Sequence, residues 1–293
     1  MSDLRYITTG TLLKIEIQNG AIELFIQSFE DETLEQSLSI FVEDIRAILN
    51  RKLRSIYLYG SAIHNDLSPG YGDLDFLVVI GEDLSQNEIE FLNKQRSNYR
   101  SSLLRRSVDR QIPNLYIDML EGAFLTINML SGEKGSGLWW GTKRESDWTE
   151  NQLDLFTMHT IKEQSILLYG ESHLDNIPSY SKEEFISFFK EYAKCMRKFG
   201  KGNSLHSVDW LLLASKFIAW WQEGVILSKS QAADWGHLHL SSGWKDNLKR
   251  CKELRKDPSM VTRLEYSEWL SNLEPAIIEA SHDLDRVLET TIH

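Results

Sequence analysis

Residues 57–80 read YLYGSAIHNDLSPGYGDLDFLVVI, and this stretch decides the fold. It predicts a strand, a tight turn at Gly60 and Ser61, a loop, and a second strand that begins with the carboxylates Asp73 and Asp75. Side chains of a strand alternate between its faces, so the two aspartates project from the same side. Because adjacent carboxylates repel unless a cation lies between them, we expect a hard-metal site here, with Mg²⁺ as the first candidate.

The turn predicts a phosphate-binding site. Gly60 has no side chain to block close approach, so backbone N–H groups and the Ser61 hydroxyl can face an anionic oxygen. Phosphate beside two metal-binding aspartates is typical of nucleotidyl transfer, in which metal ions hold the attacking and leaving oxygens around phosphorus. The alternative is a surface hairpin with a solvated aspartate pair. The turn, its spacing from the aspartates and the flanking strands together favour the nucleotide site.

The third predicted strand, residues 116–127, offers two further acids. Asp118 and Glu121 are three positions apart and would point to opposite faces of one strand, so only one of them can meet the aspartate pair. A base near the metal would remove the proton of an attacking hydroxyl. We favour Glu121, because Gly122 beside it leaves room for a ligand, and keep Asp118 as the alternative.

The stretch from Gly60 to Asp75 resembles the signature of the DNA polymerase β-like nucleotidyltransferase superfamily, which is Gly-Ser followed at this spacing by Asp-x-Asp within a strand. The resemblance implies that Asp73 and Asp75 bind Mg²⁺ and that a third acid, here Glu121, comes from a nearby strand. It does not specify the acceptor.

Composition predicts an ordered, two-domain enzyme. The chain has 293 residues, 42% of them hydrophobic, which exceeds the usual size of one domain. Cys195 and Cys251 lie far apart, so neither a disulfide framework nor a zinc site is expected. No apolar stretch approaches the roughly 20 residues that span a bilayer, and the first residues lack the apolar core of a signal peptide. We therefore expect a cytoplasmic monomer that does not contact a membrane.

The charge balance bears on the acceptor. A net charge of −11 would repel RNA or DNA over most of the surface and suits a small cationic acceptor. The densest basic stretch is predicted to be a solvated helix face, formed by Arg96, Arg100, Arg105, Arg106 and Arg110.

Hydrophobic periodicity predicts an α+β fold. Residues 1–177 are assigned to a nucleotidyltransferase domain with a small mixed β-sheet flanked by helices, and residues 178–293 to an all-α helical bundle. Within the first domain, helices are expected at 34–50, after Ser85, and at 153–169. The glycine-rich residues 131–150 predict a flexible loop. Its large aromatic side chains, either packed in a core or in contact with a ligand, are Trp139, Trp140 and Trp148.

A second match lies in the predicted helical domain. Residues 215–235 contain Ser-Lys-Phe, a glycine, and then Lys-x-x-Ala-Ala-x-Trp. They resemble the C-terminal helical domain of the streptomycin and spectinomycin adenylyltransferases, which are aminoglycoside-type O-nucleotidyltransferases. This resemblance implies that Lys216 and Lys229 contact the phosphates of ATP and that the Leu120-Glu121 pair carries the catalytic base. Cations near a triphosphate would also offset charge on departing pyrophosphate.

The acceptor region departs from that family. His206 stands where the family has an acid, although Asp209 lies close by in sequence. We predict a Mg²⁺-dependent enzyme that transfers AMP from ATP to a hydroxyl of an aminoglycoside or aminocyclitol, held by Asp209 and by Trp139, Trp140 or Trp148. A protein or tRNA acceptor, as in the antitoxin-type members, and a non-catalytic nucleotide-binding regulator are the alternatives. The acidic balance speaks against RNA, and a mere binder would not need a base.

Overall fold

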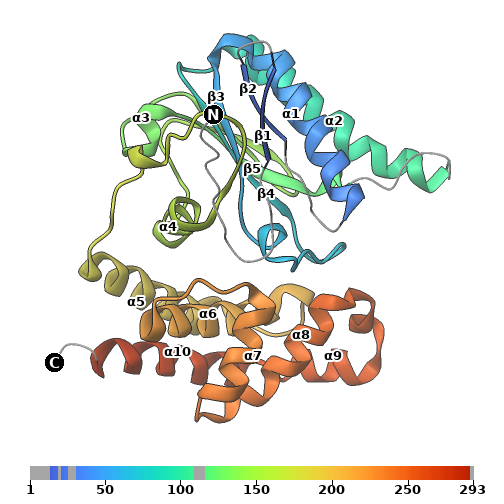
Figure 1. Cartoon of the computed structure of the whole chain (residues 1–293). Helices are drawn as coiled ribbons and strands as arrows, with labels where there is room; N and C mark the ends of the chain where they lie inside the picture. Colours follow the sequence, from blue (N-terminus) through green and yellow to red (C-terminus); the bar gives the residue numbers. More distant parts are fainter. Residues whose placement is uncertain (1–13, 19–20, 26–30, 109–115, 291–293) are drawn as a thin grey trace. The chain divides into compact units, whose positions relative to one another are not determined.

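The computed structural model describes residues 14–18, 21–25, 31–108 and 116–290 (Figure 1). The chain divides into two compact units. The sheet unit comprises residues 1–63 and 73–178, and the helical unit comprises residues 64–72 and 179–293. The sequence prediction assigned residues 64–72 to the first domain, whereas in the structure this segment packs within the helical unit.

The sheet unit contains a mixed β-sheet with strand order β7-β6-β5-β4-β3-β8. Strands β4 and β5 are parallel, and the other neighbours are antiparallel. The strands are β3 (Leu53–Leu58), β4 (Leu74–Ile80), β5 (Leu120–Thr126), β6 (Gly137–Trp140), β7 (Glu145–Trp148) and β8 (Ile166–Gly170). A separate antiparallel hairpin is formed by β1 (Lys14–Gln18) and β2 (Ala21–Phe25). The predicted mixed sheet is confirmed.

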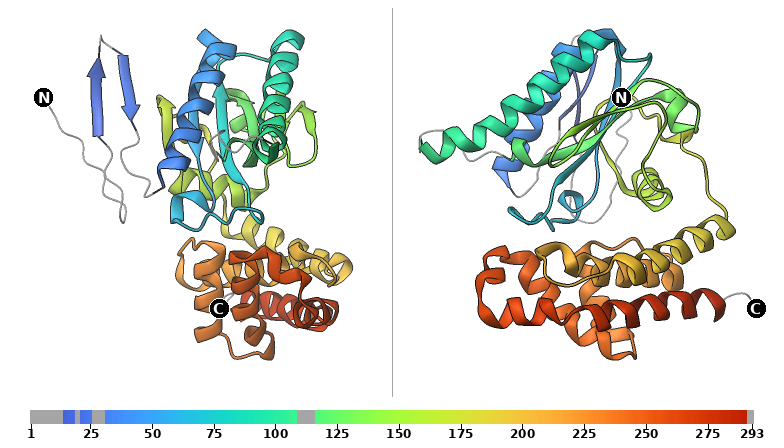
Figure 2. Two further views of the ribbon diagram at one scale, coloured as in Figure 1. Left: turned by 90° about the vertical axis from the view of Figure 1, so that its right-hand side faces the viewer. Right: turned by 180° about the vertical axis from the view of Figure 1, so that it is seen from behind.

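Two long helices, α1 (Glu32–Leu49) and α2 (Gln86–Val108), lie side by side against one face of this sheet (Figures 1 and 2). Phe41 of α1 packs on Phe76, with ring centroids 4.7 Å apart. Tyr99 of α2 meets the edge of Trp140 at 6.1 Å. The alternating strand residues Phe76 and Phe124 also contact each other on this face. The opposite face carries the intervening residues of β4 and β5, of which Leu77, Val79 and Leu125 are also buried.

Three local predictions for this unit are wrong. Residues 131–150 form the hairpin of β6 and β7 instead of a flexible loop, because their tryptophans supply cross-strand packing that outweighs the glycines. The helix expected at 153–169 ends early: α4 (Leu155–Gln164) is followed by β8, whose short apolar run fits a strand as well as a helix. The third strand starts late, because residues 117–119 form a 3₁₀ turn.

The helical unit is an all-α bundle, as predicted. Its helices are α5 (Lys182–Phe199), α6 (Asp209–Glu223), α7 (Lys229–His239), α8 (Leu248–Lys256), α9 (Leu264–Ser271) and α10 (Glu274–Thr290). Ser181 and Glu184 form the predicted capping box at the start of α5. Helices α5 and α10 pack side by side (Figure 2). In the part of the chain that the structure describes, no helix combines the length and the apolar character needed to cross a membrane.

Candidate active site

Gly60 lies directly against the Asp75 carboxylate. The glycine has φ = 76°, in the left-handed region that favours glycine. A Cβ at this position would lie 2.1 Å from Asp75 Oδ2. The backbone N–H of Tyr59 also donates to the Asp75 carbonyl at 3.0 Å. The turn that carries Ser61 is therefore closely packed against the first residues of β4.

The sheet register places Asp75 beside Glu121. The two residues are direct partners in the parallel pairing of β4 and β5, so their side chains project from the same face. Because Phe76 and Phe124 occupy the face covered by α1 and α2, the acids occupy the opposite face. Asp73 precedes β4 by one residue, and Asp118 lies in the 3₁₀ turn of residues 117–119. The register thus brings Glu121, and not Asp118, next to Asp75.

The buried Tyr59 lies close enough to these acids to feel their negative charge. Burial raises the pKa of its phenol well above the ordinary value, and the negative charges of Asp75, Asp154 and Glu121 raise it further. Asp154 was not identified from the sequence. Its carboxylate caps α4 by accepting from the Thr157 backbone N–H at 2.9 Å. The cap pattern was readable in the sequence, but the proximity of this residue to the sheet acids depends on the tertiary fold.

Glu121 is held by a residue that the sequence interpretation missed. Thr142, in the turn between β6 and β7, donates its hydroxyl to Glu121 Oε2. The same turn is fixed by Arg100 of α2, which makes an ion pair with Glu145 at 2.6 Å and donates to the Gly141 carbonyl. These contacts join residues far apart in sequence, so only the sheet pairing could reveal them. The arrangement orients the carboxylate of the candidate base.

Arg96 corrects the prediction of a solvated arginine face. It is only 1% exposed and donates to the Asp118 carbonyl at 3.2 Å. Burial, together with the positive charge of Arg100, lowers its pKa to about 10, although the negative charges of Glu145, Glu121 and Asp73 act in the opposite direction. Arg100 is half-buried, the side chains of Arg105 and Arg106 are not described, and Arg110 lies outside the described residues. The inner arginines of α2 therefore support the strands that carry the acids.

The tryptophans of the β6–β7 hairpin divide between the two faces of the sheet. Trp140 is fully buried on the core face, among Phe76, Phe124 and Tyr99, so it cannot form the expected wall for an acceptor. Trp139 pairs with Ala123, which has the same orientation as Glu121. Trp148 stacks on Trp139 with ring centroids 5.1 Å apart. These two tryptophans lie on the face of the acids.

In the helical unit, Asp209 and Lys229 form an ion pair. Lys229 Nζ lies 2.7 Å from Asp209 Oδ1, and the Tyr71 hydroxyl donates to the same oxygen at 2.9 Å. Burial alone would raise the pKa of Asp209, but a hydrogen bond from His206, the ion pair and the Tyr71 hydroxyl outweigh burial and lower the pKa to about 2. The candidate phosphate-binding lysine thus contacts the candidate acceptor-binding acid. We call Asp209, Lys229 and Tyr71 the helical cluster.

Two further features of the helical unit concern the predicted ligands. Lys216 lies half-buried on α6 beside Ser215, whose hydroxyl donates to the Ala232 carbonyl of α7 at 2.6 Å. Asp209 lines a cavity of about 520 Å³. The aromatic residues of its lining include Tyr192 and Trp210. An acid among aromatic side chains suits a cationic ligand.

The oxygen donors of the sheet unit fit Mg²⁺. This ion is commonly bound by one or two carboxylates together with substrate phosphates, which matches Asp73 and Asp75 beside the Gly60 turn. Across the described ranges, no group of three or more His, Cys, Asp or Glu side chains is close enough to hold a metal by itself. The predicted third ligand, Glu121, is bonded to Thr142. Asp73 and Asp75 make the candidate metal site, and Glu121 as its third ligand stays a prediction.

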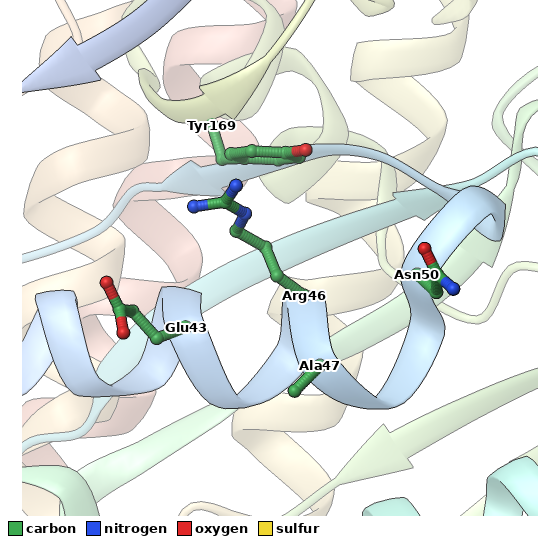
Figure 3. Close-up of a pocket in the computed structure, with 5 residues that line it drawn as sticks. All are labelled: Glu43, Arg46, Ala47, Asn50 and Tyr169. Atoms are coloured by element: carbon green, nitrogen blue, oxygen red, sulfur yellow. The ribbon is translucent and has the colours of Figure 1, made fainter.

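A separate pocket lies beside α1 and β8 (Figure 3). The Arg46 guanidinium lies 4.8 Å from the ring centroid of Tyr169, and Glu43 and Asn50 complete the polar lining. Tyr169 pairs with Ile56 in the middle of β3, whereas Gly60 follows the end of that strand. The pocket is thus distinct from the acids and holds both signs of charge.

Comparison with known proteins establishes the fold. No protein-family model matches the sequence, and no curated protein matches it. The structure is similar to the crystal structure of spectinomycin adenyltransferase AAD(9) from Enterococcus faecialis with ATP and spectinomycin, with a TM-score of 0.61 and 15% sequence identity. The match covers 87% of this chain and 99% of that one. The chain therefore has an aminoglycoside adenylyltransferase-like fold, as the resemblance in its sequence implies.

Proposed function

We propose that this chain transfers AMP from ATP to a hydroxyl of a small cationic acceptor, in the aminoglycoside or aminocyclitol class, and releases pyrophosphate. The observation that carries the proposal is the pairing of Asp75 with Glu121 on one sheet face, with the Asp75 carboxylate against the Gly60 turn. A metal-binding acid, a base and a phosphate turn are the parts that nucleotidyl transfer requires. The shared fold with an adenyltransferase supports the same conclusion.

In the proposed reaction, Glu121 accepts the proton of the acceptor hydroxyl, and the hydroxyl oxygen forms a bond to the α-phosphorus of ATP. The bond from the α-phosphorus to the oxygen of the departing pyrophosphate breaks, and that oxygen keeps the electron pair. Thr142 orients Glu121 for the proton transfer. Mg²⁺, held by Asp73 and Asp75, would neutralise phosphate charge. Lys216 and Lys229 are the candidate cations for the triphosphate.

Three observations support a cationic acceptor. The net charge of −11 favours a cation over an anionic polymer. Asp209 remains ionised at neutral pH, since its pKa is lowered to about 2. It lines a cavity that includes Trp210, and Trp139 lies on the same sheet face as Glu121. Trp139, Trp148 and Asp209 are therefore kept as candidate acceptor-binding residues, each in its own unit, and Trp140 is not, because it is buried in the core.

The test is pyrophosphate release from ATP and MgCl₂ across a panel of aminoglycosides and aminocyclitols. We expect release with at least one acceptor, and a loss of about 100-fold or more in Asp75→Asn and in Glu121→Gln, because each removes a group that acts in the transition state. The exposed Asp147 of β7 provides a matched control, Asp147→Asn, which should keep full activity. No release with any acceptor would refute the proposal. Full activity of Glu121→Gln with loss in Asp118→Asn would make Asp118 the base.

A further inference from the structure

The loop between the two halves of the nucleotide motif belongs to the helical unit. Residues 64–72, here called the strap, leave the sheet unit after Ile63 and return to it at Asp73. Ser61 lies just before the strap, and Asp73 directly follows it. Any displacement of the strap therefore acts through the backbone on both the phosphate turn and the first metal-binding acid.

Arg255 of α8 anchors the middle of the strap. Its side chain is 1% exposed, and its two terminal nitrogens donate to the Asp66 carbonyl at 3.0 and 2.7 Å. Nη1 also donates to Ser68 Oγ at 2.8 Å. The Asp66 carboxylate accepts from the backbone N–H of Ser230, at the start of α7, at 3.0 Å. A buried guanidinium with several acceptors in fixed geometry holds a segment more firmly than a single hydrogen bond.

Tyr71 anchors the end of the strap. The phenol ring is 5% exposed and lies 5.6 Å from the Arg255 guanidinium and 5.8 Å from Lys229 Nζ. The hydroxyl donates to Asp209, the ion-pair partner of Lys229. The backbone N–H groups of Tyr71 and Gly72 both donate to the Ser68 carbonyl, which closes a turn just before Asp73. These contacts fix the end of the strap, directly before Asp73 in the chain.

We propose that Arg255 and Tyr71 are positioning residues for the nucleotide site, which hold the strap so that Ser61 and Asp73, on either side of it in the chain, keep the geometry that binds MgATP. Neither residue touches the reacting atoms in this scheme. The inference rests on the proposed function, because it assumes that this site binds ATP with Mg²⁺. It adds that residues far from the motif in sequence hold the loop that joins its two halves.

The test compares Arg255→Met, Arg255→Lys, Tyr71→Phe and Ser68→Ala with the wild type. Hydrogen–deuterium exchange of peptides covering residues 64–72 reports the strap, and calorimetry with ATP, with and without MgCl₂, reports the site. Matched controls are Arg197→Met, which removes an arginine paired with Asp285, and Tyr266→Phe, which removes a hydroxyl bonded to Glu253. The partners of both control residues, Asp285 and Glu253, lie in helices α10 and α8 and outside the strap.

We expect faster exchange of the strap and a Kd for MgATP about tenfold higher in Arg255→Met, with partial rescue by Arg255→Lys, because lysine cannot reproduce the two-nitrogen contact. The gain in ATP affinity on adding MgCl₂ should shrink, a change that a general loss of folded protein would not produce. If Arg255→Met does not fold, Tyr71→Phe and Ser68→Ala test the same point with milder changes, and we expect Kd increases of a few-fold for each.

The inference alone would be overturned by wild-type affinity for MgATP in variants whose strap exchanges faster, or by unchanged exchange of the strap in every variant. Equal effects of the control variants would also overturn it. The absence of ATP binding by the wild-type protein would overturn the proposed function as well, so the two failures are distinguishable.

Discussion

The acids of the sheet unit and the helical cluster are held by different means. Asp75 and Glu121 are neighbours because of the backbone register of β4 and β5. Asp209 and Lys229 are neighbours because their side chains contact each other and Tyr71. Backbone register survives a change of side chain, whereas a side-chain cluster changes as a whole when one member is lost. We therefore expect substitutions at the sheet site to remove chemistry, and those in the cluster to change stability and pH dependence.

The largest effect is expected for Gly60→Ala, the one change that would disturb the backbone of the sheet site. Alanine at φ = 76° is strained, and its Cβ would lie 2.1 Å from Asp75 Oδ2, so the turn or the carboxylate must move. Misplacement on the scale of 1 Å can cost about 100-fold in rate. We expect at least about that loss in pyrophosphate release.

Gly132→Ala is the matched control for that change. Gly132 has φ = 91° in the same unit, and no atom lies within 4 Å of the added Cβ. The control carries similar backbone strain without the contact to a carboxylate. It should lose some stability and keep its activity. Equal losses of activity in both variants would show that strain alone, and not the packing against Asp75, explains the effect.

The next largest effect concerns the pH dependence of stability in the helical cluster. Asp209 has a folded pKa of about 2, below the ordinary value of 3.8, so its ionised form stabilises the fold above about pH 4, and this contribution is lost as the pH falls from 4 to 2. At pH 7, the free energy of unfolding should be about 2 kcal/mol lower in Asp209→Asn than in the wild type. Denaturant titrations at several pH values measure the difference.

The difference between wild type and Asp209→Asn should narrow toward pH 2. Asp234, whose carboxylate pairs with Lys252 and is 59% exposed, supplies the control variant Asp234→Asn. An exposed pair contributes at most about 1 kcal/mol, so little change is expected there. A constant difference between wild type and Asp209→Asn over this pH range would contradict the role of the ionised carboxylate in holding the cluster.

The smallest effect is expected at Thr142, which orients Glu121. Thr142→Val removes the hydroxyl with little change of shape, and Thr142→Ser keeps it. We expect kcat to fall about tenfold in the valine variant, with the KM for ATP unchanged, because a hydrogen bond to a charged group contributes roughly 1.5 to 3 kcal/mol. The serine variant should retain most of the activity. Equal loss in both variants would show that the methyl group, and not the hydroxyl, matters.

Backbone rules account for what the sequence predicted at the sheet site. Strand alternation and the Gly-Ser turn predict Asp73, Asp75 and Gly60 at one site. The same alternation allows only one of Asp118 and Glu121 to meet the aspartate pair, and the room beside Gly122 together with the sequence resemblance favours Glu121. The register supplies a reason for that choice, although the role of Glu121 stays a prediction. The fold class followed from periodicity and is confirmed.

The parts that could not be predicted depend on contacts between residues distant in sequence. The helical spacing of the arginines predicted that Arg96 is solvated. Spacing alone could not show that Arg96 points toward the sheet, where it donates to the Asp118 carbonyl in the turn before β5. Trp139 and Trp140 are adjacent and of the same type, so the sequence does not distinguish them. The pairing of β5 with β6 shows that Trp140 belongs to the core and that Trp139 lies on the face of the acids. The association of the strap with α8 likewise has no local signal in the sequence.

The strap also limits how the two units can be separated. The chain passes between them after residues 63, 72 and 178, so a cut at the linker after Pro178 leaves residues 64–72 on the fragment that carries the sheet. That fragment would expose Tyr71 and Ser68, each now 5% exposed, and the other fragment would keep Arg255 without its acceptors. The helical unit is therefore not a module that could be exchanged between relatives by swapping the C-terminal half of the gene. Such a chimera would need the strap and the bundle to come from the same parent.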